Sequence, residues 1–196
     1  MKIEVDKKTA GIIAVVAALF FALGLAINQG NDSYEMDGMH SHSSSSSDFS
    51  ADDIMFAQMM IPHHQQAVVM SDLALKNSTN PEILALAKKI KSAQAPEIEQ
   101  MKSWLAKAGT SLMGNHGMSM DGMLSENEID QLAKSSGIEF DLLFLAGMIG
   151  HHEGALTMVS MLDTTKNGEA KQLAENIRVS QTAEIAAMKK LLEEIK

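Results

Sequence analysis

The sequence predicts an all-α protein, a four-helix bundle made of two repeated helical hairpins and preceded by an N-terminal transmembrane or signal helix. No segment alternates apolar and polar residues in the way that is typical of strands. The stretch 59–70 returns as 147–158, and the stretch 90–101 returns as 177–188. Each repeat therefore holds two helices, and two hairpins that are apolar on one side bury these faces by pairing.

Residues 1–28 are predicted to be a membrane anchor or a signal segment. Three lysines precede an uncharged apolar run from Thr9 to Ile27, which reaches the roughly 18 residues needed to cross a bilayer. Positive charge before the run and acidic residues after it place the N-terminus inside and the remainder outside. We favour a retained anchor over a cleaved signal peptide, whose site would be the weak Gly24-Leu25-Ala26. Both predict a protein of the periplasm or cell surface, anchored or secreted.

Residues 29–48 are predicted to form a flexible, Ser-rich tether. The segment is too polar to bury a core of its own. It nevertheless contains Met36, Met39, His40 and His42, which a tether does not require.

The first hairpin is predicted to span residues 49–108. Ser50, followed by acidic residues, is a helix N-cap, and the helix that it begins runs to about Lys76. Asn80-Pro81 is the second start, because an N-cap residue is followed there by proline at the first helical position. That helix runs to about Ala108. Each of these helices contains an internal proline, at which we expect a bend.

A Met-rich loop, residues 109–124, leads into the second hairpin, residues 125–196. The pattern Ser125-x-x-Glu128 is a capping box that begins a short helix, and we expect Gly137 to end it. The third long helix is predicted at about 139–165. A Lys-Asn-Gly turn follows, and the fourth long helix runs to the end of the chain.

Composition excludes several classes of protein. A net charge of −9, a pI near 5.2 and the lack of a basic stripe argue against nucleic-acid binding. The chain has no cysteine, which excludes disulfides, thiolate metal sites and cysteine nucleophiles. Methionine, by contrast, is abundant at 16 residues. A soft-metal site in an oxidising compartment would therefore use thioether and imidazole groups.

Adjacent histidines occur at the same place in both repeats, as His63-His64 and His151-His152. Two adjacent imidazoles cannot both face an apolar core without burying polar nitrogens. His63 and Met70 lie about 20° from each other on one helix face. Single methionines in helices are usually core residues, and we assign Met55 and Met161 to the core. The repeated pairs, with methionine nearby, favour metal ligands.

Glu97 and Glu184 follow Gln and precede Met at helical spacing in both repeats. This spacing places the three side chains on one helix face. Carboxylates on helices are usually ordinary surface groups. The alternative is that these two bind a cation or orient an imidazole.

Thioether and imidazole ligands favour Cu(I) and, by the same softness, Ag(I). Zinc more often has Cys, or His with carboxylates, and a di-iron centre requires Glu-x-x-His motifs, which this sequence lacks. The His pairs remain compatible with Cu(II). The predicted metal ligands are Met59, Met60, His63, His64, Met70, Glu97, Met101, His116, Met118, Met120, Met148, His151, His152, Met158, Glu184 and Met188. For the loop members, the alternative is a Gly-rich surface loop.

The paired Met-Ile-x-His-His-x-x-Ala-x-x-Met and Gln-x-x-Glu-Ile-x-x-Met motifs resemble those of the domain of unknown function 305 family. The resemblance covers about 48–196. It implies a ferritin-like fold and the copper binding of exported, CopM-type periplasmic members. The residues to which it extends this role are His63, His64, Met70, His151, His152 and Met158. Gly147 stands where the first repeat has Met59, so we expect one sulphur fewer in the second site.

We therefore expect an exported protein that binds copper as Cu(I), or Ag(I), for sequestration, transfer or resistance. Its expected partners are the metal ion, the membrane through its N-terminal segment, and a copper-exporting or copper-accepting protein. We expect neither nucleic-acid binding nor enzymatic activity. The alternatives are a copper-dependent oxidoreductase, and a membrane-tethered module whose Met-rich surface binds other proteins.

Overall fold

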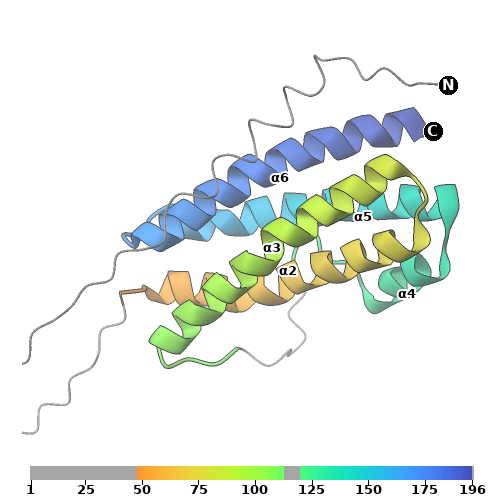
Figure 1. Ribbon diagram of the computed structural model, residues 1–196. Coiled ribbons are helices and arrows are strands. Elements are labelled where there is room, and N and C mark those ends of the chain that lie inside the picture. Colours follow the sequence, from red (N-terminus) through yellow and green to blue (C-terminus); the bar gives the residue numbers. More distant parts are fainter. Residues whose placement is uncertain (1–47, 113–119, 196) are drawn as a thin grey trace, which may run out of the picture. The chain divides into compact units, whose positions relative to one another are not determined.

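Figure 1 shows the protein as a computed structural model, in which residues 48–112 and 120–195 are described. The predicted anchor or signal segment, the tether up to residue 47, and the loop residues His116 and Met118 lie outside these ranges. Within them the chain is helical and contains no strand. The predicted all-α class is therefore confirmed.

Two hairpins of long helices make up the structure (Figure 1). The elements are α2 (Ala51–Asn77), α3 (Pro81–Lys107), α4 (Glu126–Lys134), α5 (Gly137–Val159), the 3-10 helix η1 (Ser160–Leu162) and α6 (Gly168–Ile195). Helix α2 packs on α3, α5 packs on α6, and the two hairpins meet mainly between α2 and α5. This is the predicted four-helix bundle, with α4 as a short additional helix between the hairpins.

The predicted caps begin three of the helices. Ser50 and Ser125 each form a capping box with the residue three positions later, and the Asn80 side chain caps α3. Pro62 and Pro96 both lie inside helices that continue past them. The side chains that close the first turns therefore fix where the hairpins start.

The predicted boundaries around the third long helix were wrong. Helix α4 ends at Lys134 with Ser135 as its C-cap, before Gly137 is reached. Gly137 instead begins α5 with a φ of +60°, a conformation that glycine adopts without strain. At the other end, α5 gives way to η1 after Val159, so the helical segment stops before residue 165.

Helix α5 and η1 form the most apolar segment among the described residues. Gly137–Leu162 is long and apolar enough to cross a membrane by length and composition. More than half of its apolar stretch is buried inside the bundle, however. A helix at the centre of a protein core has the same composition, so this segment is interpreted as a core helix.

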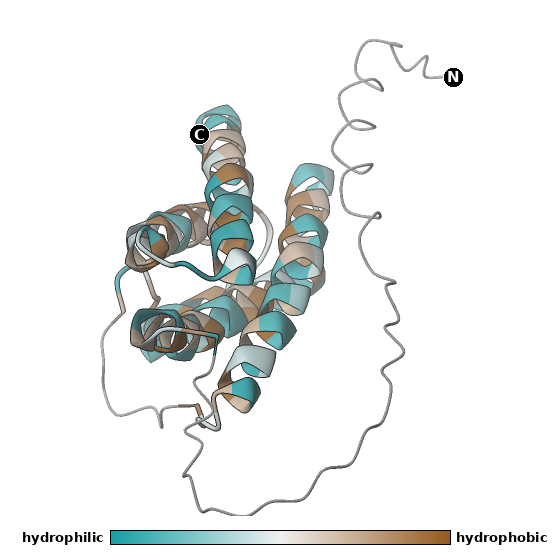
Figure 2. Ribbon diagram, turned by 90° about the vertical axis from the view of Figure 1, so that its left-hand side faces the viewer, coloured by the Kyte–Doolittle hydropathy of each residue, from teal (hydrophilic) through white to brown (hydrophobic). Residues whose placement is uncertain are grey.

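The apolar core consists of two clusters, one toward each end of the bundle. Cluster 1 contains residues within 49–61, 98–105 and 155–177. Cluster 2 contains residues within 67–90, 132–149 and 188–191. Figure 2 shows that each long helix carries both hydrophobic and hydrophilic positions along its length. On all four long helices the interval between the two clusters contains buried polar residues.

Candidate metal centre

A layer of buried polar side chains divides the core in two, and we call it the polar layer. It contains the four histidines of the repeated pairs, which are fully buried, and Gln94, Gln181 and Glu184, which are at most 3% exposed. Glu97 belongs to the same layer, and its side chain is 15% exposed. Burying so many polar groups is costly unless each one gains a partner.

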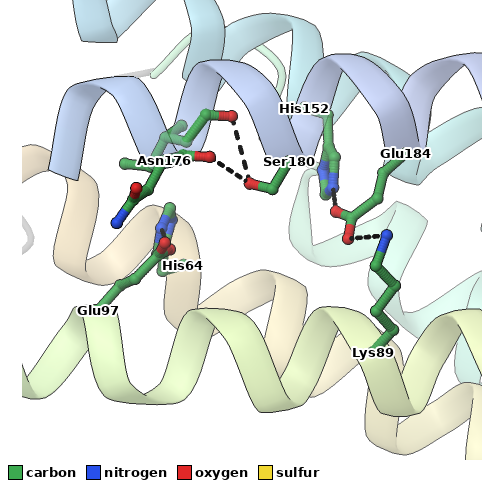
Figure 3. A network of polar contacts seen from close by, with 8 residues as sticks. His64, Lys89, Glu97, His152, Asn176, Ser180 and Glu184 are labelled. Carbon is green, nitrogen blue, oxygen red and sulfur yellow. Dashed lines mark hydrogen bonds and ion pairs between the residues drawn. The ribbon is translucent and has the colours of Figure 1, made fainter. Parts of the chain in front are cut away.

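In each hairpin, one histidine of the layer contacts a glutamate on the neighbouring helix (Figure 3). His64 Nε2 lies 2.8 Å from Glu97 Oε2, and His152 Nε2 lies 2.9 Å from Glu184 Oε2. Because an ionised carboxylate only accepts hydrogen bonds, Nε2 of each ring carries a proton in this contact. This contact corresponds to the orienting role of a carboxylate behind a metal-binding imidazole.

The other two histidines, His63 and His151, come from different hairpins and meet at the centre of the polar layer. Their ring centroids are 3.8 Å apart, with an angle of 38° between the ring planes. His63 Nε2 lies 3.3 Å from the backbone oxygen of Asp121. A carbonyl oxygen only accepts, so Nε2 of His63 carries a proton in this contact. The two repeats thus contribute to a single centre.

Several polar atoms of the layer are buried without a hydrogen-bond partner among the described residues. The imidazole atoms concerned are Nδ1 of His63, His64, His151 and His152, and Nε2 of His151. Both side-chain amide atoms of Gln94 and the side-chain amide oxygen of Gln181 also lack a partner among the described residues. Buried polar atoms in proteins nearly always have a partner. Their concentration here indicates a site that a ligand completes.

Burial keeps the central histidines neutral. It lowers the pKa of His63 from 6.5 to about 3, with repulsion from His64 in the same direction and the Asp121 carbonyl opposing it. Burial also lowers the pKa of His151 well below its usual value, and the three other imidazoles act in the same direction. Neutral imidazole is the form that binds a metal ion.

The buried methionines among the predicted ligands lie on both sides of the polar layer. Cluster 1 holds Met60, Met101 and Met158. Cluster 2 holds Met70, Met148 and Met188. Each cluster combines methionines from both repeats, so a His/Met stripe on one helix does not make a site by itself.

Two further predicted methionines among the described residues, Met59 and Met120, are less deeply buried. Met59 is partly buried and packs against cluster 1, and Met120 is buried at 9% exposure. Met55 was expected in the core, but it is 41% exposed. Met55 therefore lies on an exposed face of α2. The spacing of the methionines along the helix did not show which face would be exposed.

No three His, Asp or Glu side chains within residues 48–112 and 120–195 are arranged so that they could hold a metal ion. Imidazole and carboxylate groups are therefore insufficient in this arrangement. A metal ion in the polar layer would need further donors, and thioether sulphur is the donor that the two clusters supply.

A short segment, residues 120–124 of the predicted Met-rich loop, packs across the polar layer, and this contact was not predicted from the sequence. Gln66 holds it through two hydrogen bonds of 2.8 Å, donating to the Leu124 carbonyl oxygen and accepting from the Leu124 amide. On α5, a Cβ atom added to Gly154 would lie only 2.0 Å from the backbone oxygen of Asp121. Gln66 and Gly154 occupy corresponding positions in the two repeats. This replacement of glutamine by glycine was the one feature of the repeat that could have indicated the contact with the loop.

Lys89, an exposed residue beside the polar layer, provides a second contact that sequence reasoning missed. Its Nζ lies 3.3 Å from Glu184 Oε1, an ion pair without the geometry of a hydrogen bond (Figure 3). A lysine on an exposed helix position is ordinary, and no motif marked it. The corresponding residue of the second repeat is Asn176.

Comparison with known proteins gives one family match. The family described as a domain of unknown function, DUF305, matches residues 53–192. The DUF305 fragment from Deinococcus radiodurans is 31% identical, with a TM-score of 0.67 over 74% of this chain and 97% of that chain. A DUF305 protein from Streptomyces coelicolor, whose name describes it as secreted, is 32% identical, with a TM-score of 0.69 over 74% of this chain and 96% of that chain.

A metal-bound structure is also among the similar ones. CopM in its Cu(I)-bound form is 36% identical, with a TM-score of 0.62 over 72% of this chain and 96% of that chain. CopM has also been solved with Cu(II) and with Ag. No curated protein matches the chain.

Proposed function

Because this chain belongs to the DUF305 family, as its motifs predicted, we propose that it is an exported protein that binds Cu(I), and Ag(I), in its polar layer. The family description assigns no activity. The similarity to CopM, whose structures hold copper and silver, supports the choice of metal. The donor atoms of this chain support it independently.

One observation carries the proposal: four buried imidazoles, each with an unpartnered Nδ1, lie between two apolar clusters that each contain three of the predicted methionines. Imidazole with thioether suits soft monovalent cations, whereas zinc more often takes cysteine, or histidine with carboxylates. Both central histidines are neutral, so a metal ion displaces no proton from them near neutral pH. The unpartnered atoms would become the metal ligands.

We assign a role to each group of predicted residues. Nδ1 of the four histidines supplies nitrogen, and the six buried methionines of the two clusters supply sulphur. Glu97 and Glu184 orient His64 and His152 rather than binding the metal directly. Met59, which packs against cluster 1, and Met120 would supply additional sulphur, and His116 and Met118 remain proposed ligands outside the described residues.

The proposed role is sequestration or transfer of copper, with no enzymatic activity. Flexible thioether ligands suit the uptake and release of an ion, whereas an enzyme requires a rigid site with an open coordination position. The N-terminal segment would export the chain, and a secreted relative supports this location. A copper-exporting or copper-accepting protein would then exchange the ion with the polar layer.

The test is a Cu(I) titration of the full-length protein against a chromophoric Cu(I) chelator under reducing conditions. The wild type is expected to compete for Cu(I). A variant with leucine at His63, His64, His151 and His152 fills the same space without nitrogen donors. Its affinity should fall by more than the roughly 10- to 100-fold that the loss of an orienting partner costs. Circular dichroism verifies that the variant is helical.

Methionine variants distinguish metal ligands from side chains that only pack in the core. Leucine at Met60, Met101 and Met158 preserves apolar volume, so it should lower copper capacity with little change in stability. Met55→Leu is the matched control, because this side chain is exposed. Failure of the wild type to compete, or undiminished binding by the histidine variant, would rule out the proposal.

A further inference from the structure

The two His–Glu pairs of the polar layer differ in their charged neighbours, although the repeat makes them equivalent in position. Glu184 contacts His152 and also the ammonium group of Lys89, 3.3 Å from Oε1. Among the ion pairs of the described chain, Glu97 contacts His64 alone. The carboxylate of one pair therefore has an ammonium group beside it, while the carboxylate of the other does not.

The difference arises at a single pair of corresponding residues. Lys89 on α3 corresponds to Asn176 on α6. Asn176 is neutral and is engaged within its own helix, where its side-chain oxygen accepts from Gln172 Nε2 at 2.9 Å. Figure 3 draws Asn176 at the end of the layer that holds the His64–Glu97 pair, and Lys89 at the opposite end. An amide thus stands where the other repeat has an ammonium.

The two glutamates also differ in their exposure to solvent. The Glu97 side chain is 15% exposed, whereas that of Glu184 is 2% exposed. A cation that arrives from solvent therefore meets a partly exposed carboxylate with no lysine beside it at one end of the layer. At the other end it meets a covered carboxylate and a lysine.

We propose that Lys89 makes the two halves of the polar layer unequal, so that a soft monovalent cation binds first beside the His64–Glu97 pair. The inference rests on the proposed function and specifies its order of loading. The ammonium repels an incoming cation. It also competes for the carboxylate that polarises His152, which makes Nδ1 of that ring a weaker donor. Both effects weaken binding in the same half.

The size of the difference follows from solvent screening. Lys89 is 53% exposed, so water and salt reduce its repulsion. It perturbs an orienting partner without removing it. We therefore expect about a three- to tenfold difference between the halves, at or below the range for losing such a partner.

The experiment follows individual imidazoles. Full-length protein with 15N-labelled histidine is titrated with Ag(I), which needs no reductant, and the Nδ1 signals of His64 and His152 are recorded by NMR. The His64 signal should change at about three- to tenfold lower free Ag(I) than the His152 signal. Lys89→Asn copies the residue of the other repeat, and it should bring the two midpoints together.

Two further variants test the cause. Asn176→Lys should raise the Ag(I) concentration at which His64 responds. Lys91→Asn removes the same charge from the same helix, where Lys91 pairs with the exposed Asp72, and it should preserve the wild-type order.

The outcomes distinguish the two proposals. If both imidazoles respond together in the wild type, if His152 responds first, or if the gap survives Lys89→Asn, the inference on loading order is overturned while metal binding stands. If neither imidazole responds to Ag(I), the proposed function fails as well.

Discussion

The two repeats differ most where the segment 120–124 crosses them. Three corresponding pairs change to glycine in the second repeat: Met59 to Gly147, Pro62 to Gly150 and Gln66 to Gly154. The first repeat holds the segment by the Gln66 side chain. The second lets it approach the helix backbone. The comparison shows that one asymmetric loop accounts for two of these departures, at Gly147 and Gly154, where an added Cβ would meet residues of the loop.

The glycines make close approach feasible. A Cβ atom on Gly154 would lie 2.0 Å from the backbone oxygen of Asp121, and one on Gly122 would lie 2.3 Å from the backbone oxygen of Gly150. At Gly147, an added Cβ would meet the Leu124 side chain at 3.0 Å and the Met70 methyl group at 3.3 Å. Gly147 lacks a sulphur, but it makes room for a methionine of the other hairpin.

The largest effect should come from adding a side chain at Gly154, where the loop backbone contacts α5. We expect Gly154→Ala to cost about 3 kcal/mol or more in the free energy of unfolding, because its Cβ collides with backbone rather than with a flexible side chain. Gly150→Ala is the matched control on the same helix. Its Cβ would have no neighbour within 4 Å, so this variant should gain about 0.5–1 kcal/mol from helix propensity. Urea denaturation measures both, and equal values would contradict the packing argument.

Acid should destabilise the centre of the layer, to which each repeat contributes one buried histidine. The folded-state pKa of His63 is about 3, below its usual 6.5. Between these values the unfolded chain binds a proton that the folded chain excludes. The stabilisation is therefore complete above pH 6.5 and is lost as the pH falls toward about 3. His63 alone should cost about 1.4 kcal/mol per pH unit, hence about 2 kcal/mol between pH 6.5 and 5.

The measurement is urea denaturation at pH 7 and pH 5, a range above the usual titration of carboxylates. His151, whose pKa is also lowered, adds a loss of the same sign. His63→Leu should remove the contribution of His63 to the pH dependence of the free energy of unfolding. His151→Leu should remove the contribution of His151. If the free energy of unfolding of the wild type does not decrease between pH 7 and pH 5, the central imidazoles are protonated in the folded protein.

Sequence reasoning reached the fold because the repeat and the caps are local signals. Ser50, Asn80 and Ser125 begin helices where their side chains predicted it. The spacing of Glu97 placed it on a face with glutamine and methionine, but periodicity describes one helix and not the helix opposite. The assembly of Met70 with methionines of the second repeat depends on how α2 and α5 pack. Neither that packing nor the Lys89 contact leaves a trace in residue spacing.

The smallest effect should come from the first-repeat side of the loop. Gln66→Ala removes two 2.8 Å hydrogen bonds to the Leu124 backbone, and we expect a cost of about 1–2 kcal/mol. The cost is smaller than at Gly154 because the loop can still rest on α5. Gln58→Ala, which removes one exposed bond to the Ser111 carbonyl oxygen, should cost less. Hydrogen exchange of the Leu124 amide gives the local readout. It should be slow in the wild type and fast in Gln66→Ala, and an unchanged rate would mean that the glycine side alone holds the loop over the layer.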